Sequence, residues 1–448
     1  MQELIQLFVR SLIVTADCAH PRLNTKKITI GLCKSMFNWY VKNKLGESLC
    51  LAKWTNSTMH LGIGKNHSCH HPDPHVVPIE EVEADPSALH NSSYKRSVRN
   101  QMLNGERPSE CDYCWRIEKT EKYSDRVLMS KKRLALPYRK DIITSDRYDP
   151  TMLEVSFSNV CNFKCAYCGP QFSSLWTSEI SNLGAYPTSN NYNQINEPQI
   201  LDKEHNPYID AFWKYLPTMY DKLHILRITG GEPMLSRHTD ILLDYIAKHP
   251  NKKLTVVINS NLGAPKKVIE NFIEKLKKIQ PSVKKVEIAT SGEAYGKQAE
   301  YARDGLDYQQ WLKNCNYVLT AMPKLRLNLM CAYNVLSVST FNLFLKDIIK
   351  LKNTYKRVQL SISYVRHPDF LHPSLAPKSL IGLLEDDRST IKKHFNNETV
   401  QRFDFVIQQF KLESTEKQQQ DFKAFVIEYD TRRQKNFLNT FPEYRSIV

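Results

Sequence analysis

Three cysteines fall within one short segment, at Cys161, Cys165 and Cys168. Cysteine thiolates are the standard ligands of iron–sulfur clusters. Three of them on one loop can hold a cubane and leave its fourth iron without a protein ligand. Such an open position suits catalysis, whereas structural metal sites are closed. Structural zinc would need a fourth ligand, and the next histidine is the distant His205. The spacing therefore favours an open iron–sulfur cluster, with a zinc knuckle or chance clustering as the alternatives.

Short β-rich runs alternate with helical patterns around this segment. The runs are 153–157, 224–229, 254–259, 285–290, 325–333 and 357–365. Strands that alternate with helices form parallel βαβ units. Six units are fewer than the eight of a closed barrel, and spacing alone does not separate a partial barrel from a doubly wound sheet. In either fold, the active site is expected at the C-terminal ends of the strands.

Polar and glycine-rich segments follow the second and third runs. Gly230 and Gly231 would let the backbone approach a ligand closely, with Glu232 as an acceptor beside it. Asn259 and Asn261 suit contacts to a ribose, and a helix N-cap explains them equally well. The stretch 184–206, rich in Asn, Pro, Ser and Tyr, has the length of a loop that is either functional or mobile.

The cysteine motif, with Tyr167 before its third cysteine, resembles the signature of the radical S-adenosylmethionine (SAM) superfamily. The resemblance covers about 150–370 and implies a partial (β/α)6 barrel. It also implies that SAM chelates the open iron and that the reduced cluster cleaves SAM to a 5′-deoxyadenosyl radical, which abstracts a substrate hydrogen. An external electron donor, such as flavodoxin or ferredoxin, would then be a partner.

The same resemblance implies contacts to SAM. The segment 230–233 matches the family's GGEP motif, which binds the SAM amino group. Gly292-Glu293 stands where the family often has Asp-Gly, which puts individual roles nearby in doubt. The implied contacts are Tyr167, Gly230, Gly231, Glu232, Pro233, Asn259, Asn261, Ser291, Arg303 and Asn334.

A second group of cysteines comprises Cys50, Cys69, Cys111 and Cys114. The CxxC at its end is a compact two-ligand motif for iron–sulfur or zinc. The group resembles the auxiliary-cluster domains called twitch and SPASM, although Lys53 stands where the family has proline. The resemblance implies a second [4Fe–4S] cluster on these four thiolates. Structural zinc and unrelated thiols are the alternatives. The histidines near Cys69 that are further possible zinc ligands are His67, His70, His71 and His75.

The predicted fold class is α/β with three zones. Residues 1–140 form an N-terminal α+β auxiliary iron–sulfur domain, 150–370 the partial (β/α)6 barrel, and 375–448 a helical C-terminal extension that covers it. Residues 4–14 predict an amphipathic helix rather than a signal peptide. No apolar run is long enough for a membrane span, so the expected location is the cytoplasm. The cysteines expected as buried apolar fillers are Cys18, Cys33, Cys315 and Cys331.

The net charge of +15 favours an anionic partner or acidic peptide, although solubility alone explains it too. Auxiliary-cluster relatives often modify peptides, so the first hypothesis is a radical SAM enzyme that acts on a peptide or protein side chain. The second is a radical SAM enzyme for a small molecule or nucleoside. The third is a non-enzymatic, cysteine-rich nucleic-acid-binding module, which would leave the motifs as coincidence and is therefore disfavoured.

Overall fold

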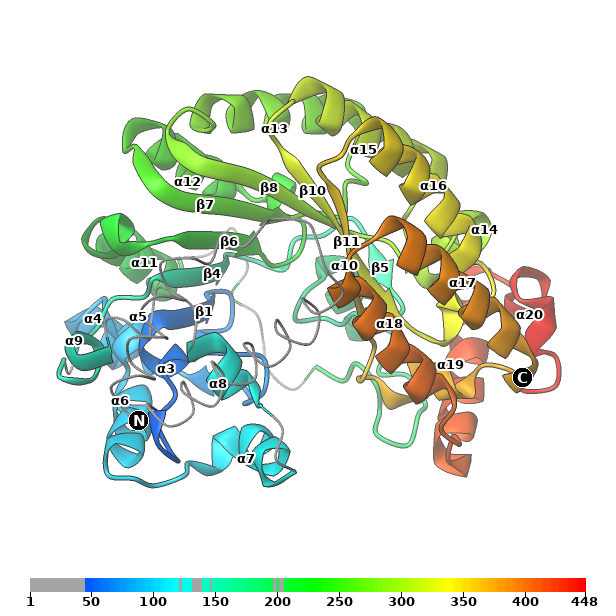
Figure 1. The fold of residues 1–448 in the computed structure, drawn as a ribbon, viewed down its shortest axis with the longest axis horizontal. Helices are drawn as coiled ribbons and strands as arrows, with labels where there is room; N and C mark the ends of the chain where they lie inside the picture. Colours follow the sequence, from blue (N-terminus) through cyan, green and yellow to red (C-terminus); the bar gives the residue numbers. More distant parts are fainter. Residues whose placement is uncertain (1–44, 121–122, 131–138, 146, 196–199, 201–204) are drawn as a thin grey trace, which may run out of the picture. The chain divides into compact units, whose positions relative to one another are not determined.

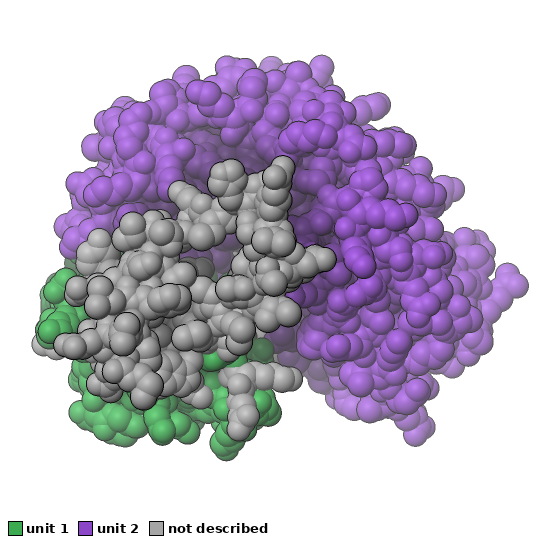
Figure 2. All heavy atoms as spheres, in the orientation of Figure 1, with its two compact units in different colours: residues 1–58, 66–151 green, residues 59–65, 152–448 purple. Residues whose placement is uncertain are grey.

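The computed structural model describes residues 45–448 except 121–122, 131–138, 146, 196–199 and 201–204. The chain forms two compact units, residues 1–58 with 66–151, and residues 59–65 with 152–448. Figure 2 colours them separately. The expected helix at 4–14, Cys18 and Cys33 lie outside the described residues. Within the described residues, no helix is both long and apolar enough to cross a membrane.

A parallel sheet organises the second unit (Figure 1). Its described parallel strands are β4 (Met152–Ser156), β6 (Ile225–Thr229), β7 (Asn251–Asn259), β8 (Val283–Ser291), β10 (Arg326–Tyr333) and β11 (Val358–Tyr364). Each overlaps one of the predicted runs, so the α/β class is confirmed. The strands lie side by side in chain order. A doubly wound sheet reverses its order at a switch point, so this order excludes that alternative.

Amphipathic helices follow the strands and cover one side of the sheet in Figure 1. These helices are α12 (Arg237–Lys248), α13 (Lys266–Ile279), α15 (Tyr308–Ala321) and α16 (Phe341–Thr354). In α13, Ile269, Phe272, Ile273 and Leu276 recur at helical spacing and are buried, while the lysines at the two ends of the helix are exposed. Cys315 and Cys331 are buried in the core, as expected.

The C-terminal helices belong to the same unit as the sheet. They are α17 (Ile381–His394), α18 (Asn397–Phe410), α19 (Glu416–Arg433) and α20 (Phe437–Thr440). The extension packs through aromatic side chains. Phe403 stacks on Phe341 of α16 at 5.6 Å between ring centroids, and Tyr429 lies 5.2 Å from Tyr301.

A short antiparallel ribbon, absent from the sequence prediction, lies outside the main sheet. It joins β5 (Lys164–Cys165) to β9 (Arg303–Asp304), so that Cys165 is the register partner of Arg303. The Ala166 N–H extends the ribbon by donating to the carbonyl of Ala302 at 2.8 Å. The cysteine motif is thereby held against a segment that lies far along the chain.

The described part of the first unit is mainly helical, with short strands. Its helices include α3 (Ala52–Thr55), α6 (Ser93–Leu103), η1 (Ser109–Cys111), α7 (Asp112–Lys119) and α8 (Asp125–Ser130). Trp54 and Trp115 fill a core with three of the four cysteines of the second group. The buried pair of Arg126 and Glu118, 2.6 Å apart, ties α7 to α8, and the Arg126 guanidinium also donates to the Leu49 carbonyl at 2.8 Å. The loop that carries Cys50 is fixed against these helices.

Candidate functional site

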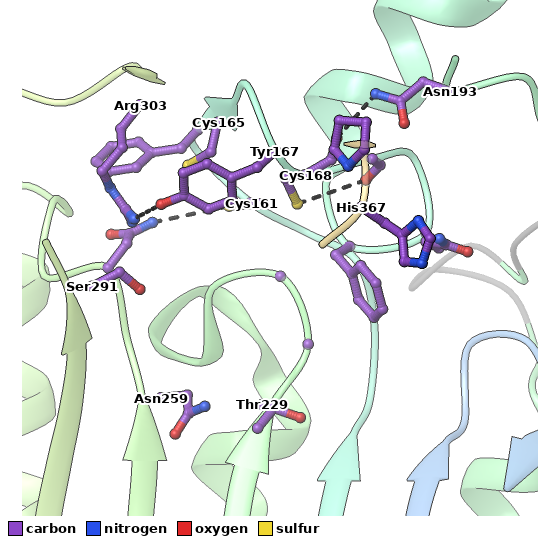
Figure 3. Close-up of a pocket in the computed structure, with 18 of the residues that line it drawn as sticks. Cys161, Cys165, Tyr167, Cys168, Asn193, Thr229, Asn259, Ser291, Arg303 and His367 are labelled. Atoms are coloured by element: carbon purple, nitrogen blue, oxygen red, sulfur yellow. Dashed lines mark hydrogen bonds between the residues drawn. The ribbon is translucent and has the colours of Figure 1, made fainter. Parts of the chain in front are cut away.

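A cavity of about 560 Å³ opens at the C-terminal ends of the parallel strands (Figure 3). Thr229, Asn259 and Ser291 stand at the ends of β6, β7 and β8 and line it. The opposite wall is the loop between β4 and α10 (Ser174–Leu183). The predicted site residues that line the cavity are Cys161, Cys165, Tyr167, Cys168, Gly230, Gly231, Asn259, Asn261, Ser291 and Arg303.

The three motif cysteines hold the loop in a compact shape. The Cys168 N–H donates to the Cys165 carbonyl at 2.9 Å, which turns the chain between the two thiols. Asn261 Nδ2 lies 3.9 Å from the Cys161 sulfur and donates to it. Burial raises the pKa of the Cys161 thiol to about 12. Thiols in such surroundings stay protonated unless a metal takes the proton's place.

The paired glycines serve chain packing as well as access to the cavity. A Cβ on Gly231 would stand 2.1 Å from the Val160 carbonyl oxygen, and Gly230 has φ +120°, which L side chains rarely adopt. The Gly231 N–H donates to the Ser158 carbonyl at 3.0 Å. Glycine is required here because the turn after β6 presses against the start of the cysteine loop.

Glu232 takes a place different from the expected one. Its side chain is 1% exposed and is absent from the cavity wall. Its carboxylate accepts the N–H groups of Asn261 at 2.7 Å and Met234 at 3.1 Å. Burial raises its pKa to about 7, even though the Asn261 hydrogen bond lowers it. In this structure Glu232 joins the turns after β6 and β7 and holds Asn261 beside Cys161.

Pro233 and Asn334 also lie outside the cavity wall. Asn334 is fully buried after β10 and caps the 3-10 turn η5 (Val335–Ser337). Its side-chain oxygen accepts the Leu336 N–H and its amide donates to the Ala332 carbonyl, both at 2.8 Å. These two hydrogen bonds commit one donor and one acceptor of the amide to the backbone, and the SAM contact expected at Asn334 stays a prediction.

A buried polar triad lies between the cysteine loop and β9. The Tyr167 hydroxyl donates to Glu293 Oε1 at 2.8 Å and accepts from Arg303 Nη1 at 2.5 Å. Burial raises the pKa of Glu293, while the Arg303 charge and the Tyr167 hydrogen bond lower it in part. Within the described residues, Arg303 Nε and Glu293 Oε2 are buried without a hydrogen-bond partner. Glu293, which stands where the family often has glycine, thus supplies a carboxylate that fixes Tyr167 and Arg303, two of the predicted SAM contacts.

The segment 184–195 adds wall residues that sequence reasoning did not name. The Tyr192 hydroxyl lies 2.9 Å from the Cys168 carbonyl and 3.0 Å from that of Ala166. Asn193 Nδ2 also donates to the Cys168 carbonyl, at 3.0 Å. The composition of this stretch was the available signal, because it indicated a long loop of functional or mobile character. Side chains from Gln171, Asn190 and His367 complete this wall.

The model of the radical SAM superfamily matches residues 155–348 of this chain. The chain carries a radical SAM domain. The protein is therefore an enzyme, and the hypothesis of a non-enzymatic binding module is wrong. No curated protein matches the chain.

Among solved structures, the chain is similar to SuiB of Streptococcus suis. The identity is 16%, over 76% of this chain and 68% of that one, with a TM-score of 0.37. The structure of SuiB bound to S-adenosylmethionine has 16% identity over 71% of this chain and 64% of that one, with a TM-score of 0.37. The structure of SuiB bound to precursor peptide SuiA has 15% identity over 75% of this chain and 70% of that one, with a TM-score of 0.35. Likeness at this level assigns no substrate.

The donor set of the radical SAM domain fits a [4Fe–4S] cluster. Cys161, Cys165 and Cys168 face one cavity from a single loop, with room beside them for a ligand. Among the described residues, no three His, Cys, Asp or Glu side chains surround a single metal ion. A cubane does not need that arrangement, because each thiolate binds a different iron. The chemistry of three thiolates without a fourth protein ligand matches an open cluster.

The four cysteines of the second group line a small cavity of their own in the first unit. Burial raises the pKa of Cys50 to about 12 and of Cys111 to about 11. Of the nearby histidines, His71 alone lines this cavity in the described chain, and its ring binds Asp125 at 2.7 Å. Four thiols around one buried pocket fit the ligand set of a [4Fe–4S] cluster, in which each thiolate binds a different iron, whereas in the described chain no three of them surround a single ion.

Buried cations accompany these thiols. Lys53, 4% exposed, lines the cavity and pairs with Glu110. Arg99 is 2% exposed and binds His90 and the Lys53 carbonyl, whereas burial and the Arg99 charge lower the pKa of the neighbouring Lys95 well below its usual range. Buried charges are normally compensated. Thiolates around a metal would supply negative charge that offsets these cations.

Proposed function

We propose that this radical SAM enzyme has a partial (β/α)6 barrel that holds a [4Fe–4S] cluster on Cys161, Cys165 and Cys168. When bound, the cluster and SAM would supply a 5′-deoxyadenosyl radical for hydrogen abstraction. The observation that carries this proposal is the convergence of three thiols on one cavity at the C-terminal ends of the parallel strands. Arg303, Tyr167, Ser291 and the glycine turn would bind and orient SAM.

The proposed substrate is a peptide or protein side chain. The wall beyond the thiols carries the amide or imidazole groups of Gln171, Asn190, Asn193 and His367. Amides donate and accept hydrogen bonds, which suits the amide groups of a peptide. The net charge of +15 suits an acidic peptide. A small molecule or nucleoside is the alternative, and an acidic flavodoxin or ferredoxin would supply electrons in the cytoplasm.

We further propose a second [4Fe–4S] cluster of the twitch/SPASM type on Cys50, Cys69, Cys111 and Cys114. Its support is the shared cavity of the four thiols and the two buried cations that line it, Lys53 and Arg126. Zinc on the same thiolates is the competing centre.

Metal analysis of the anaerobically purified protein tests both sites. We expect about eight irons and eight sulfides per chain, because each cubane holds four irons, and an EPR signal of the reduced protein that SAM perturbs. Cys165→Ala should abolish 5′-deoxyadenosine formation, whereas Cys114→Ala should halve the iron and keep the SAM-perturbed signal. Iron for one cluster together with zinc would make the second site structural. Deoxyadenosine from Cys165→Ala would overturn the first site.

A further inference from the structure

Six charged side chains meet behind the cysteine loop, on the side away from the cavity. This anchor cluster consists of Lys164, Glu179, Asp304, Arg432, Arg433 and Lys435. Asp304 forms ion pairs with Lys435 at 2.7 Å and with Arg433 at 3.3 Å. Glu179 forms ion pairs with Lys164 at 2.8 Å and with Arg433 at 3.0 Å. The cluster therefore joins the end of α19 to the β5–β9 ribbon and to α10.

The ribbon connects this anchor cluster to the cavity. Arg303 and Asp304 are consecutive in β9, and consecutive side chains of a strand point to opposite faces. Arg303 lines the cavity, while Asp304 belongs to the anchor cluster. On the paired strand β5, Cys165 likewise lines the cavity, while Lys164 belongs to the anchor cluster. Each strand thus carries one cavity residue and one anchored residue.

Aromatic packing fills the space between α19 and the cysteine loop. Tyr429 is fully buried, and its hydroxyl donates to the Tyr301 carbonyl at 2.9 Å. The Arg433 guanidinium lies 3.8 Å from the Tyr429 ring centroid and 4.7 Å from that of Trp176. Trp176 Nε1 in turn donates to the Cys165 carbonyl at 3.0 Å. An unbroken set of contacts therefore runs from α19 to a cluster cysteine.

We propose that the end of α19 is a positioning element of the SAM cavity, which acts through Asp304 and the β5–β9 ribbon to hold Cys165 and Arg303 in place. No residue of α19 lines the cavity. Arg433 is 2% exposed in its side chain, so its charge is committed to these contacts. Burial would raise the pKa of Asp304, but Lys435, Arg433 and Lys164 lower it below its ordinary value. Loss of one partner leaves the others poorly compensated, so the ribbon should shift.

Lys435→Met and Asp304→Asn test the proposal, because both side chains are partly exposed and the changes preserve size. The readouts are 5′-deoxyadenosine formation by the dithionite-reduced full chain as a function of SAM, and the SAM-induced change in the EPR signal. We expect KM for SAM to rise about tenfold, with full iron content and little change in kcat. Lys435→Arg should restore KM to near the wild-type value.

Arg402→Met is the matched control, because it breaks an exposed ion pair with Glu398 on α18. It should leave KM for SAM unchanged. A lower unfolding temperature for Lys435→Met and Asp304→Asn with wild-type KM and EPR response would reduce the anchor cluster to a purely structural role and overturn the proposal. A wild-type protein that loads iron but forms no deoxyadenosine would instead refute the proposed function itself.

Discussion

The Tyr167 hydroxyl donates to Glu293 Oε1 at 2.8 Å, which joins the cysteine loop to the end of β8. Arg303 completes the triad by donating to the same hydroxyl. The carboxylate therefore fixes an aromatic ring and a cation that both line the cavity. Its two oxygens differ, since Oε1 accepts from tyrosine, whereas Oε2 lies 3.7 Å from Arg303 Nη1 and has no hydrogen-bond partner among the described residues.

Glu293→Ala should weaken SAM binding about tenfold, because it removes the acceptor of Tyr167 and the countercharge of Arg303. Glu293→Gln should have a smaller effect, since its amide oxygen can still accept the tyrosine hydrogen bond. Titration of the SAM-induced EPR change measures both. Equal affinities for SAM in both variants and in the wild type would show that Glu293 does not contribute to SAM binding.

Asn261→Ala should make the reduction potential of the SAM-site cluster more negative. The reason is that hydrogen bonds to cluster sulfurs stabilise the reduced, more anionic state, and Asn261 donates to Cys161. Redox titration monitored by EPR provides the value. Full iron content serves as the control for loading, and an unchanged or less negative potential would contradict this role.

Lys53→Met should lower the reduction potential of the proposed second cluster, because it removes a buried ammonium beside the four thiols. Lys53→Arg keeps the charge and should stay close to wild type. The potential of the second EPR signal distinguishes the two variants. A shift in both, or in neither, would show that charge at this position does not tune the site.

Asp387 makes stability depend on pH. It is 1% exposed in α17, and its Oδ2 has no hydrogen-bond partner in the part of the chain that the structure describes. Burial, with the nearby Asp386 charge, raises its pKa to about 7. The folded state therefore holds a proton that the unfolded state releases near pH 4. The free energy of unfolding is therefore highest below about pH 4, where this group is protonated in both states. It falls as the pH rises to about 7, by an amount on the order of a few kcal/mol.

Asp387→Asn should remove this pH dependence and raise the unfolding temperature at pH 8 above that of wild type. Thermal unfolding at pH 5.5 and pH 8 measures the difference. The exposed Glu385→Gln on the same helix is the matched control and should not alter the slope. A destabilised Asp387→Asn protein at pH 8 would show that the carboxylate is ionised and needed in the fold.

The sequence alone determined the local features of this protein. Short β-rich runs that alternate with helical patterns predicted the positions of the six parallel strands that the structure describes in the second unit, because each buried strand or helix face leaves its own pattern in the chain. The spacing of Cys161, Cys165 and Cys168 predicted a thiolate site, because three ligands on one loop need no distant partner. Their position after the first strand predicted the end of the sheet where the cavity opens.

Tertiary structure decided the relationships between distant segments. The chain order of the strands, the pairing of Cys165 with Arg303, and the junction of Asp304 with Lys435 join residues that no local periodicity connects. The displacement of Glu232 and Asn334 from the cavity wall has the same origin, because their partners are backbone groups that only the folded chain brings near. Motifs reveal which side chains can do chemistry, whereas packing and hydrogen bonding decide which of them face the site.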